Sequence, residues 1–162
     1  MKFTPILLLG AVLALAACAD EPEIDASSNA GANTGGELSP NSVEYFRQVV
    51  GDRVFFATDR HDLDLTAQTT LSGQAQWLTS NPGMTATIEG HADERGTREY
   101  NLALGARRAN SVKAFLVSKG VDASRLRAVS FGKERPIALG SDSNSWAQNR
   151  RGMSVIAGAP SS

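Results

Sequence analysis

The chain has almost no cysteine, no strong excess of charge of either sign and no long apolar segment. Its single cysteine, Cys18, cannot form an intramolecular disulfide, and a cysteine-based metal site is not expected. Lys and Arg number 16 against 17 Asp and Glu, for a formal net charge of −1. This balance argues against nucleic acid as a partner, because nucleic-acid binders carry a strongly basic face. The length of 162 residues suits one domain plus a tail.

The longest apolar run is short and lies at the N-terminus. Residues 6–15 are apolar apart from Gly10, follow the basic Lys2 and lead to the sequence LAAC at residues 15–18. This run falls short of the roughly 20 apolar residues that cross a bilayer. A basic start, a short apolar core and a small-residue end are typical of a secretion signal, so we predict a signal peptide at residues 1–17. A retained membrane helix and an ordinary signal with a free cysteine are the alternatives.

The sequence LAAC resembles the bacterial lipobox, in which the cysteine is acylated and becomes the first residue of the mature protein. The resemblance implies lipidation of Cys18, and several acyl chains at about 0.8 kcal/mol per buried CH2 hold a protein stably to a membrane. In lipoproteins the residue after the cysteine sorts between membranes, and Ala19 resembles the outer-membrane signal. We therefore expect a lipid anchor in the outer membrane, with the folded domain in the periplasm.

Residues 18–40 are poor in apolar side chains and rich in Asp, Glu, Ser, Asn, Ala and Gly. Only Ile24 and Leu38 are larger aliphatics, so this segment cannot bury enough surface to fold. We predict a lipidated, flexible linker with an r.m.s. span of roughly 26 Å. The domain is then expected at residues 41–158, followed by a short tail at residues 159–162.

Hydrophobic periodicity predicts the order β-α-β-α-β-β within the domain, with a loop or short helix near Trp146 before the last strand. Helix-sized connections between the first three strands favour helices packed on a sheet with some parallel neighbours. We therefore predict an α/β (α+β) sandwich with helices on a mixed four-stranded sheet. The expected strands are residues 54–57, 84–90, 126–131 and 153–157, and the expected helices are residues 67–78 and 100–118, the second with Thr97 ahead of it.

The second helix carries a basic residue on its apolar half. The apolar residues expected on that half are Leu102, Leu104, Gly105, Ala109, Val112, Phe115 and Leu116. Arg108 and Asn101 share it, and a buried arginine without a partner costs several kcal/mol. We expect an anion beside Arg108, either a structural carboxylate or that of a ligand. An acid of the preceding loop, Asp93 or Glu94, and this arginine could together grip a molecule with a neighbouring ammonium and carboxylate.

The loop and the start of this helix form a long motif. Residues 90–110 read GHADERGTxEYNxxLGxRRAN, and FGKERP at residues 131–136 and NRR at residues 149–151 follow in order. These stretches resemble the peptidoglycan-binding signature of the OmpA-like domain family, and within it the peptidoglycan-associated lipoproteins. The likeness covers about residues 54–157, and its implied fold is the predicted sandwich.

The resemblance implies recognition without reaction. In that family an aspartate and an arginine fifteen residues apart hold the diaminopimelate of the peptidoglycan stem peptide, which implies Asp93 for the ammonium and Arg108 for the carboxylate. No enzyme activity, cofactor or metal is expected. The resemblance adds four residues to the expected site, two with largely backbone contacts and two from the helix: Thr58, Asp59, Asn101 and Leu104.

The family resemblance also implies partners: peptidoglycan, and TolB and TolA of the Tol-Pal system, which helps the outer membrane follow the constricting wall at cell division. A protein-interaction module whose main ligand is TolB is the alternative function. A wall-cleaving enzyme using Asp93 and Glu94 and a metal site at His61 and His91 are weaker alternatives. Whether Arg150 and Arg151 cap the domain or line the groove stays open.

Overall fold

The computed structural model describes residues 38–158; Cys18, the predicted signal and most of the predicted linker lie outside them. No helix in the described part combines the length and apolarity needed to cross a membrane. The elements are, in chain order, α1 (Val43–Tyr45), the π-helical η1 (Phe46–Gly51), β1 (Arg53–Phe55), α2 (Leu65–Ser80), β2 (Thr85–His91), α3 (Arg98–Ser118), the 3-10 turn η2 (Ala123–Arg125), β3 (Leu126–Gly132), α4 (Ser143–Asn149) and β4 (Arg151–Ala157).

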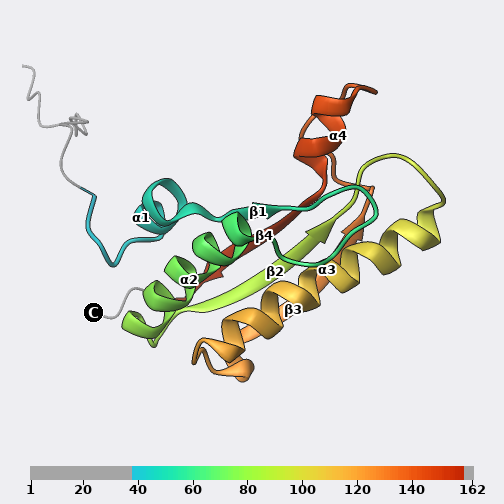
Figure 1. Cartoon of the computed structure of the whole chain (residues 1–162). Coiled ribbons are helices and arrows are strands. Elements are labelled where there is room, and N and C mark those ends of the chain that lie inside the picture. The colour runs from blue at the N-terminus through green and yellow to red at the C-terminus, as the bar shows by residue number, and fades with distance from the viewer. Residues whose placement is uncertain (1–37, 159–162) are drawn as a thin grey trace, which may run out of the picture. The chain divides into compact units, whose positions relative to one another are not determined.

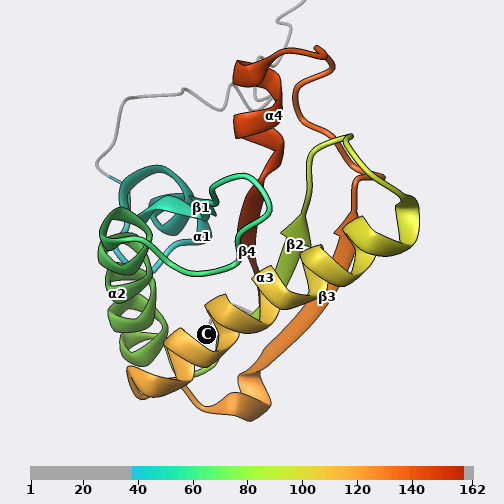
Figure 2. The same cartoon turned by 45° about the vertical axis from the view of Figure 1, so that its right-hand side comes forward.

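The strands form one mixed four-stranded sheet in the order β1-β4-β2-β3, which confirms the predicted fold. β2 and β3 are parallel, whereas β4 is antiparallel to both β1 and β2. Figures 1 and 2 show α2 and α3 on the same face of the sheet, with the short α4 beyond its end. Since β1 and β2 both run antiparallel to β4, which lies between them, their carboxyl ends lie at the same end of the sheet. The loops that follow them are therefore neighbours.

Local side-chain chemistry explains where the two long helices begin. Asp64 Oδ1 accepts the Ala67 backbone N–H at 2.7 Å, and Thr97 Oγ1 accepts that of Tyr100 at 3.2 Å. Such caps satisfy N–H groups that have no partner within the helix. Gly120, at φ 96°, follows the end of α3 in the left-handed conformation that glycine tolerates. Both long helices begin two residues earlier than predicted, α2 ends two residues later, the end of α3 at Ser118 is confirmed, and the strand ends shift by at most two residues.

The helical segment α1–η1 ahead of β1 was not predicted. Its Phe46 is fully buried, with its ring centroid 4.9 Å from that of Trp77 in α2. Trp77 Nε1 also donates to the Pro40 carbonyl at 2.7 Å. The segment is too short for helical periodicity to emerge from the sequence, so a tertiary contact stabilises it.

Helix α3 crosses the sheet at backbone contact, through a seam of two glycines. A Cβ on Gly90 of β2 would lie 1.8 Å from the Gly105 carbonyl oxygen, and a Cβ on Gly105 would lie 2.4 Å from Ser130 Oγ. Only glycine permits this approach. This contact between Gly90 and Gly105 determines which side of α3 faces the sheet. The buried residues of α3 are Asn101, Leu104, Gly105, Arg108, Ala109, Val112 and Leu116.

The prediction for Leu102 was wrong. We expected it on the buried half of α3, but it is 49% exposed. At about 100° per residue the buried side chains of α3 cover one arc of the helix, and Leu102 lies just beyond the edge of that arc, next to Ala109. Arg108 and Asn101, the two polar residues predicted on the apolar side, are both buried.

We predict that Gly105→Ala lowers the free energy of unfolding by about 2 kcal/mol or more, because the overpacked contact outweighs the gain of about 1 kcal/mol in helix propensity. Urea unfolding measures this change. Gly83→Ala is the matched control, since a Cβ there meets nothing within 4 Å and the φ angle of Gly83 is not positive. Equal free energies of unfolding for Gly105→Ala and Gly83→Ala would contradict the close contact of α3 with the sheet at Gly105.

Candidate functional site

A cavity of about 290 Å³ opens where the loops after β1 and β2 meet the first turns of α3. It is lined by Thr58, Asp59, Asp93, Arg95, Gly96, Tyr100, Asn101, Leu104 and Arg108. The lining includes all six residues expected from the family resemblance, although they come from three separate segments. Arg95, Gly96 and Tyr100 were not predicted as site residues. They lie within the same motif, so proximity in sequence could have suggested them.

Arg108 is the deepest charged group of the site. It is fully buried, and its guanidinium donates to three backbone carbonyls: Nε to Arg60 at 2.8 Å, Nη1 to His91 at 2.7 Å and Nη2 to Ala57 at 3.2 Å. These carbonyls belong to the loop after β1 and to the end of β2. Arg108 therefore joins the two loops that frame the cavity.

Of the two anions expected beside Arg108, a structural carboxylate or that of a ligand, the structure contains no structural carboxylate in that position among the described residues. Within residues 38–158 no carboxylate lies within 4.0 Å of its guanidinium, and carbonyl dipoles take that place. Burial lowers the pKa of Arg108 to about 10, although the negative charge of Asp93 opposes the shift. The group stays protonated at neutral pH. A guanidinium has five N–H groups, so three carbonyl bonds leave donors for an anion in the cavity.

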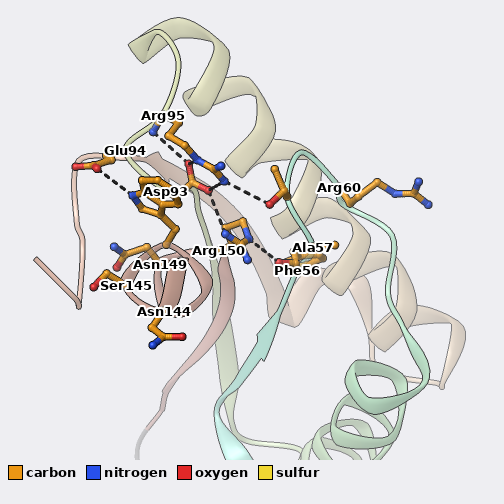
Figure 3. A network of polar contacts seen from close by, with 12 residues as sticks. Phe56, Ala57, Arg60, Asp93, Glu94, Arg95, Asn144, Ser145, Asn149 and Arg150 are labelled. Atoms are coloured by element: carbon orange, nitrogen blue, oxygen red, sulfur yellow. Dashed lines mark hydrogen bonds and ion pairs between the residues drawn. The ribbon is translucent and has the colours of Figure 1, made fainter. Parts of the chain in front are cut away.

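Asp93 is the negatively charged group that is buried at the site, and two arginines hold it (Figure 3). Arg95 Nη2 lies 2.7 Å from Oδ2 and Arg95 Nε 3.2 Å from Oδ1, while Arg150 Nη1 lies 3.3 Å from Oδ2. Burial by itself would raise the pKa of Asp93, but hydrogen bonds from Arg95 and Arg150 outweigh it and hold the pKa below its usual value. Asp93 is therefore ionised at neutral pH.

Arg150, just before β4, and Arg151, its first residue, have roles that the sequence left open and that differ in the structure. Arg150 links the segment after β1 to the loop after β2, because its Nε donates to the Phe56 carbonyl at 2.9 Å and its Nη1 to Asp93. Arg151 is buried and donates through Nη2 to the Arg135 carbonyl at 3.1 Å. Arg150 thus supports the cavity from outside its lining, and Arg151 ties β4 to the connection between β3 and α4.

Polar contacts brace the rest of the rim. Asp59 has a φ of 57°, a left-handed conformation that aspartate tolerates better than most residues, and its carboxylate accepts the Tyr100 hydroxyl. Asn101 Nδ2 donates to the Arg95 carbonyl at 2.7 Å, and Lys133 Nζ donates to the carbonyls of Glu94 and Gly96. The loop that carries Asp93 is therefore fixed from α3 and from the turn after β3.

His91 underlies the site at the end of β2. Its ring is almost fully buried and stacks on Phe131 at 5.5 Å, and neither ring nitrogen has a hydrogen-bond partner within the described residues. Glu89 Oε2 lies 3.4 Å from Nε2. Burial, followed by the charges of Arg151 and Arg135, lowers the pKa of His91 to about 4. The imidazole is therefore neutral at physiological pH.

Comparisons with known proteins agree with this fold and motif. The model of the OmpA family matches residues 55–150. Two curated relatives named "Peptidoglycan-associated lipoprotein" come from Mesorhizobium japonicum, at 49% identity over 97% of this chain and 94% of the relative, and from Haemophilus influenzae, at 42% identity over 93% and 95%. The resemblance found in the sequence is confirmed.

Solved structures give the same result. The crystal structure of the peptidoglycan-associated lipoprotein from Burkholderia pseudomallei is 46% identical, with a TM-score of 0.64 over 65% of this chain and 90% of that chain. The C-terminal domain of Helicobacter pylori MotB has a TM-score of 0.63 at 19% identity, which shows the fold alone. Since the Burkholderia chain is almost entirely the matched domain, a domain of this size folds without the N-terminal segment in that relative.

We predict that His91 makes the domain less stable in mild acid. The unfolded chain keeps a pKa near 6.5, so it binds the proton more tightly than the folded state, and stability falls as pH drops from about 6.5 towards 4. Between pH 7 and pH 5 this contribution is up to about 2 kcal/mol, measurable by urea unfolding. His91→Phe should flatten the dependence in that window.

The chain provides its own control, because its only other histidine, His61, is exposed. His61→Gln should keep the wild-type pH dependence. If both variants follow the wild-type curve, the buried imidazole is not the group that titrates.

Proposed function

The chain belongs to the OmpA family, and from that membership we propose that it is an outer-membrane lipoprotein that binds peptidoglycan non-covalently. The observation that carries the proposal is the presence, in one cavity, of an ionised aspartate and of a buried guanidinium that no carboxylate of residues 38–158 neutralises. A molecule bearing a carboxylate and an ammonium on one carbon complements this arrangement. The free end of diaminopimelate in the stem peptide has that chemistry.

In the proposed complex the ligand carboxylate accepts the remaining N–H donors of Arg108, and its ammonium donates to Asp93. Both contacts are charge-assisted hydrogen bonds in a partly desolvated cavity, which strengthens them relative to water. Thr58, Asp59, Asn101 and Leu104 complete the wall around the ligand. These side chains bind and orient; the proposed mechanism includes no covalent step.

We also propose the anchor that the sequence predicts. Acylated Cys18 would hold the chain in the outer membrane, and the following linker would let the domain reach the wall. The proposal is supported by the lipobox-like LAAC sequence and by relatives that are named lipoproteins and align with 91–97% of this chain. Many tethered copies on a continuous polymer gain effective concentration, so each pocket can bind weakly.

Contact with the Tol proteins TolB and TolA, and with it a role in outer-membrane constriction at division, is a second part of the proposal. It is supported by large apolar side chains that stay exposed at the cavity and on the adjoining first turn of α3, namely Tyr100 at 44% and Leu102 at 49%. Exposed apolar groups beside a binding site suit a protein partner. Such a partner would cover the same end of the domain as the ligand.

We predict that the chain from Ala19 onward binds a stem-peptide fragment with meso-diaminopimelate at least ten-fold more tightly than the same fragment with lysine, in calorimetric titration. Lysine lacks the carboxylate that Arg108 would pair with, and a hydrogen bond to a charged group contributes about 1.5–3 kcal/mol. This comparison changes the ligand and leaves the buried arginine intact. Equal affinities for the two fragments would show that Arg108 does not bind the ligand carboxylate.

We predict further that Asp93→Asn weakens binding of the diaminopimelate fragment by about ten- to a hundred-fold, because it removes the charge that faces the ammonium. Asp62→Asn is the matched control. Asp62 is exposed, pairs with Arg60 in the loop after β1 and does not line the cavity. Equal losses in the two variants would indicate a general electrostatic effect instead of a site at Asp93.

A further inference from the structure

Arg95 lies inside the cavity and engages the residue expected to hold the ligand's ammonium. Its guanidinium contacts both carboxylate oxygens of Asp93, at 2.7 Å through Nη2 and at 3.2 Å through Nε. The same Nη2 lies 3.3 Å from Thr58 Oγ1 on the other loop. The side chain thus spans the cavity between the two loops that frame it.

The two arginines on Asp93 differ in how firmly they are held. The Arg150 side chain is 14% exposed and is tied to the Phe56 carbonyl, so it belongs to the scaffold. The Arg95 side chain is 42% exposed, and its other contacts are the Thr58 hydroxyl and the face of Trp146, 4.3 Å from Cζ. The Arg95 end of the pair is partly in water, so the guanidinium itself loses little when it leaves. Asp93 is 9% exposed and needs a cation in its place, so Arg95 can leave when another cation replaces it, whereas Arg150 stays fixed.

We propose that Arg95 is an internal competitor for the ammonium subsite: its guanidinium stands in for the ligand's ammonium on Asp93 and leaves when the ligand binds. The inference rests on the proposed function, since it concerns the same pocket. Binding becomes an exchange of one cation for another, so the Asp93 charge is paired before and after. A neutral ligand cannot perform this exchange, which restricts the pocket to ligands that carry a cationic group.

The surroundings of Arg95 offer it a contact besides Asp93. The Trp146 ring faces the Arg95 guanidinium and donates through Nε1 to Glu94 at 2.9 Å. Gly96, the next residue, has a φ of 87° and no Cβ to restrict the loop. Arg95 can thus leave Asp93 and keep its contact with the Trp146 ring, so the guanidinium does not enter bulk water alone.

Calorimetric titration of Arg95→Ala and Arg95→Gln with the meso-diaminopimelate fragment tests the proposal. Removing the competitor should tighten binding about three- to five-fold, the ratio that corresponds to a partly exposed ion pair. Arg98→Ala is the matched control: Arg98 is 74% exposed, lies outside the cavity lining, pairs with Glu134 and carries the same charge three residues away. Its affinity should stay within two-fold of the wild type.

The outcomes separate the two ideas. Wild-type binding with unchanged or weaker binding in both Arg95 variants overturns the competitor and leaves the proposed function standing. No binding by the wild type or by either variant overturns the proposed function and the inference together. Binding by the variants alone supports the competitor, because the wild type would then be blocked.

A direct measurement follows the side chain itself. In wild-type protein the Arg95 Nε–H resonance, assigned by its loss in Arg95→Gln, should shift on saturation with the fragment as the bond to Asp93 breaks. In Asp93→Asn the Arg95 Nε–H resonance should differ from that of the wild type before any fragment is added, because the bond to the carboxylate is already absent. A resonance that does not move in the saturated wild type contradicts displacement, whatever the affinities.

Discussion

A buried guanidinium determines how this domain is put together around its site. Arg108 is buried, and the loops after β1 and β2 supply three of its N–H groups with carbonyl partners. An unsatisfied buried charge would cost several kcal/mol, so those loops are held in the geometry that supplies the carbonyls. The cavity exists between the loops because the arginine holds them at that separation. Stability and the proposed recognition therefore depend on the same side chain.

The position of Arg108 depends in turn on the glycine seam. Gly90 and Gly105 bring α3 to backbone contact with the sheet, which places the arginine one turn further along the helix beneath the loop that carries Asp93. A larger residue at the seam would lift α3 and withdraw the guanidinium from the His91 carbonyl. Packing between a helix and a sheet thus sets the geometry of a polar site several residues away.

The charges at the site are paired unevenly. Arg150 and Arg95 neutralise Asp93, and carbonyl dipoles solvate Arg108 without neutralising it. A ligand that supplies one carboxylate and one ammonium would leave the total unchanged. Such an exchange favours modest affinity and ready release, which suits a protein that holds a polymer through many weak contacts.

The sequence by itself determined the order of the four strands and the two long helices, and its family resemblance indicated the six residues that now line one cavity. Periodicity depends on neighbours along the chain, so it can be read from the sequence. The family resemblance rests on the long motif of residues 90–110. Only the tertiary structure decided what surrounds the charges: carbonyls at Arg108, two arginines at Asp93, and the burial of Phe46 ahead of β1. Those partners lie up to 57 residues apart. Hydrogen-bond geometry and burial across such distances depend on how the elements pack, which no local pattern encodes.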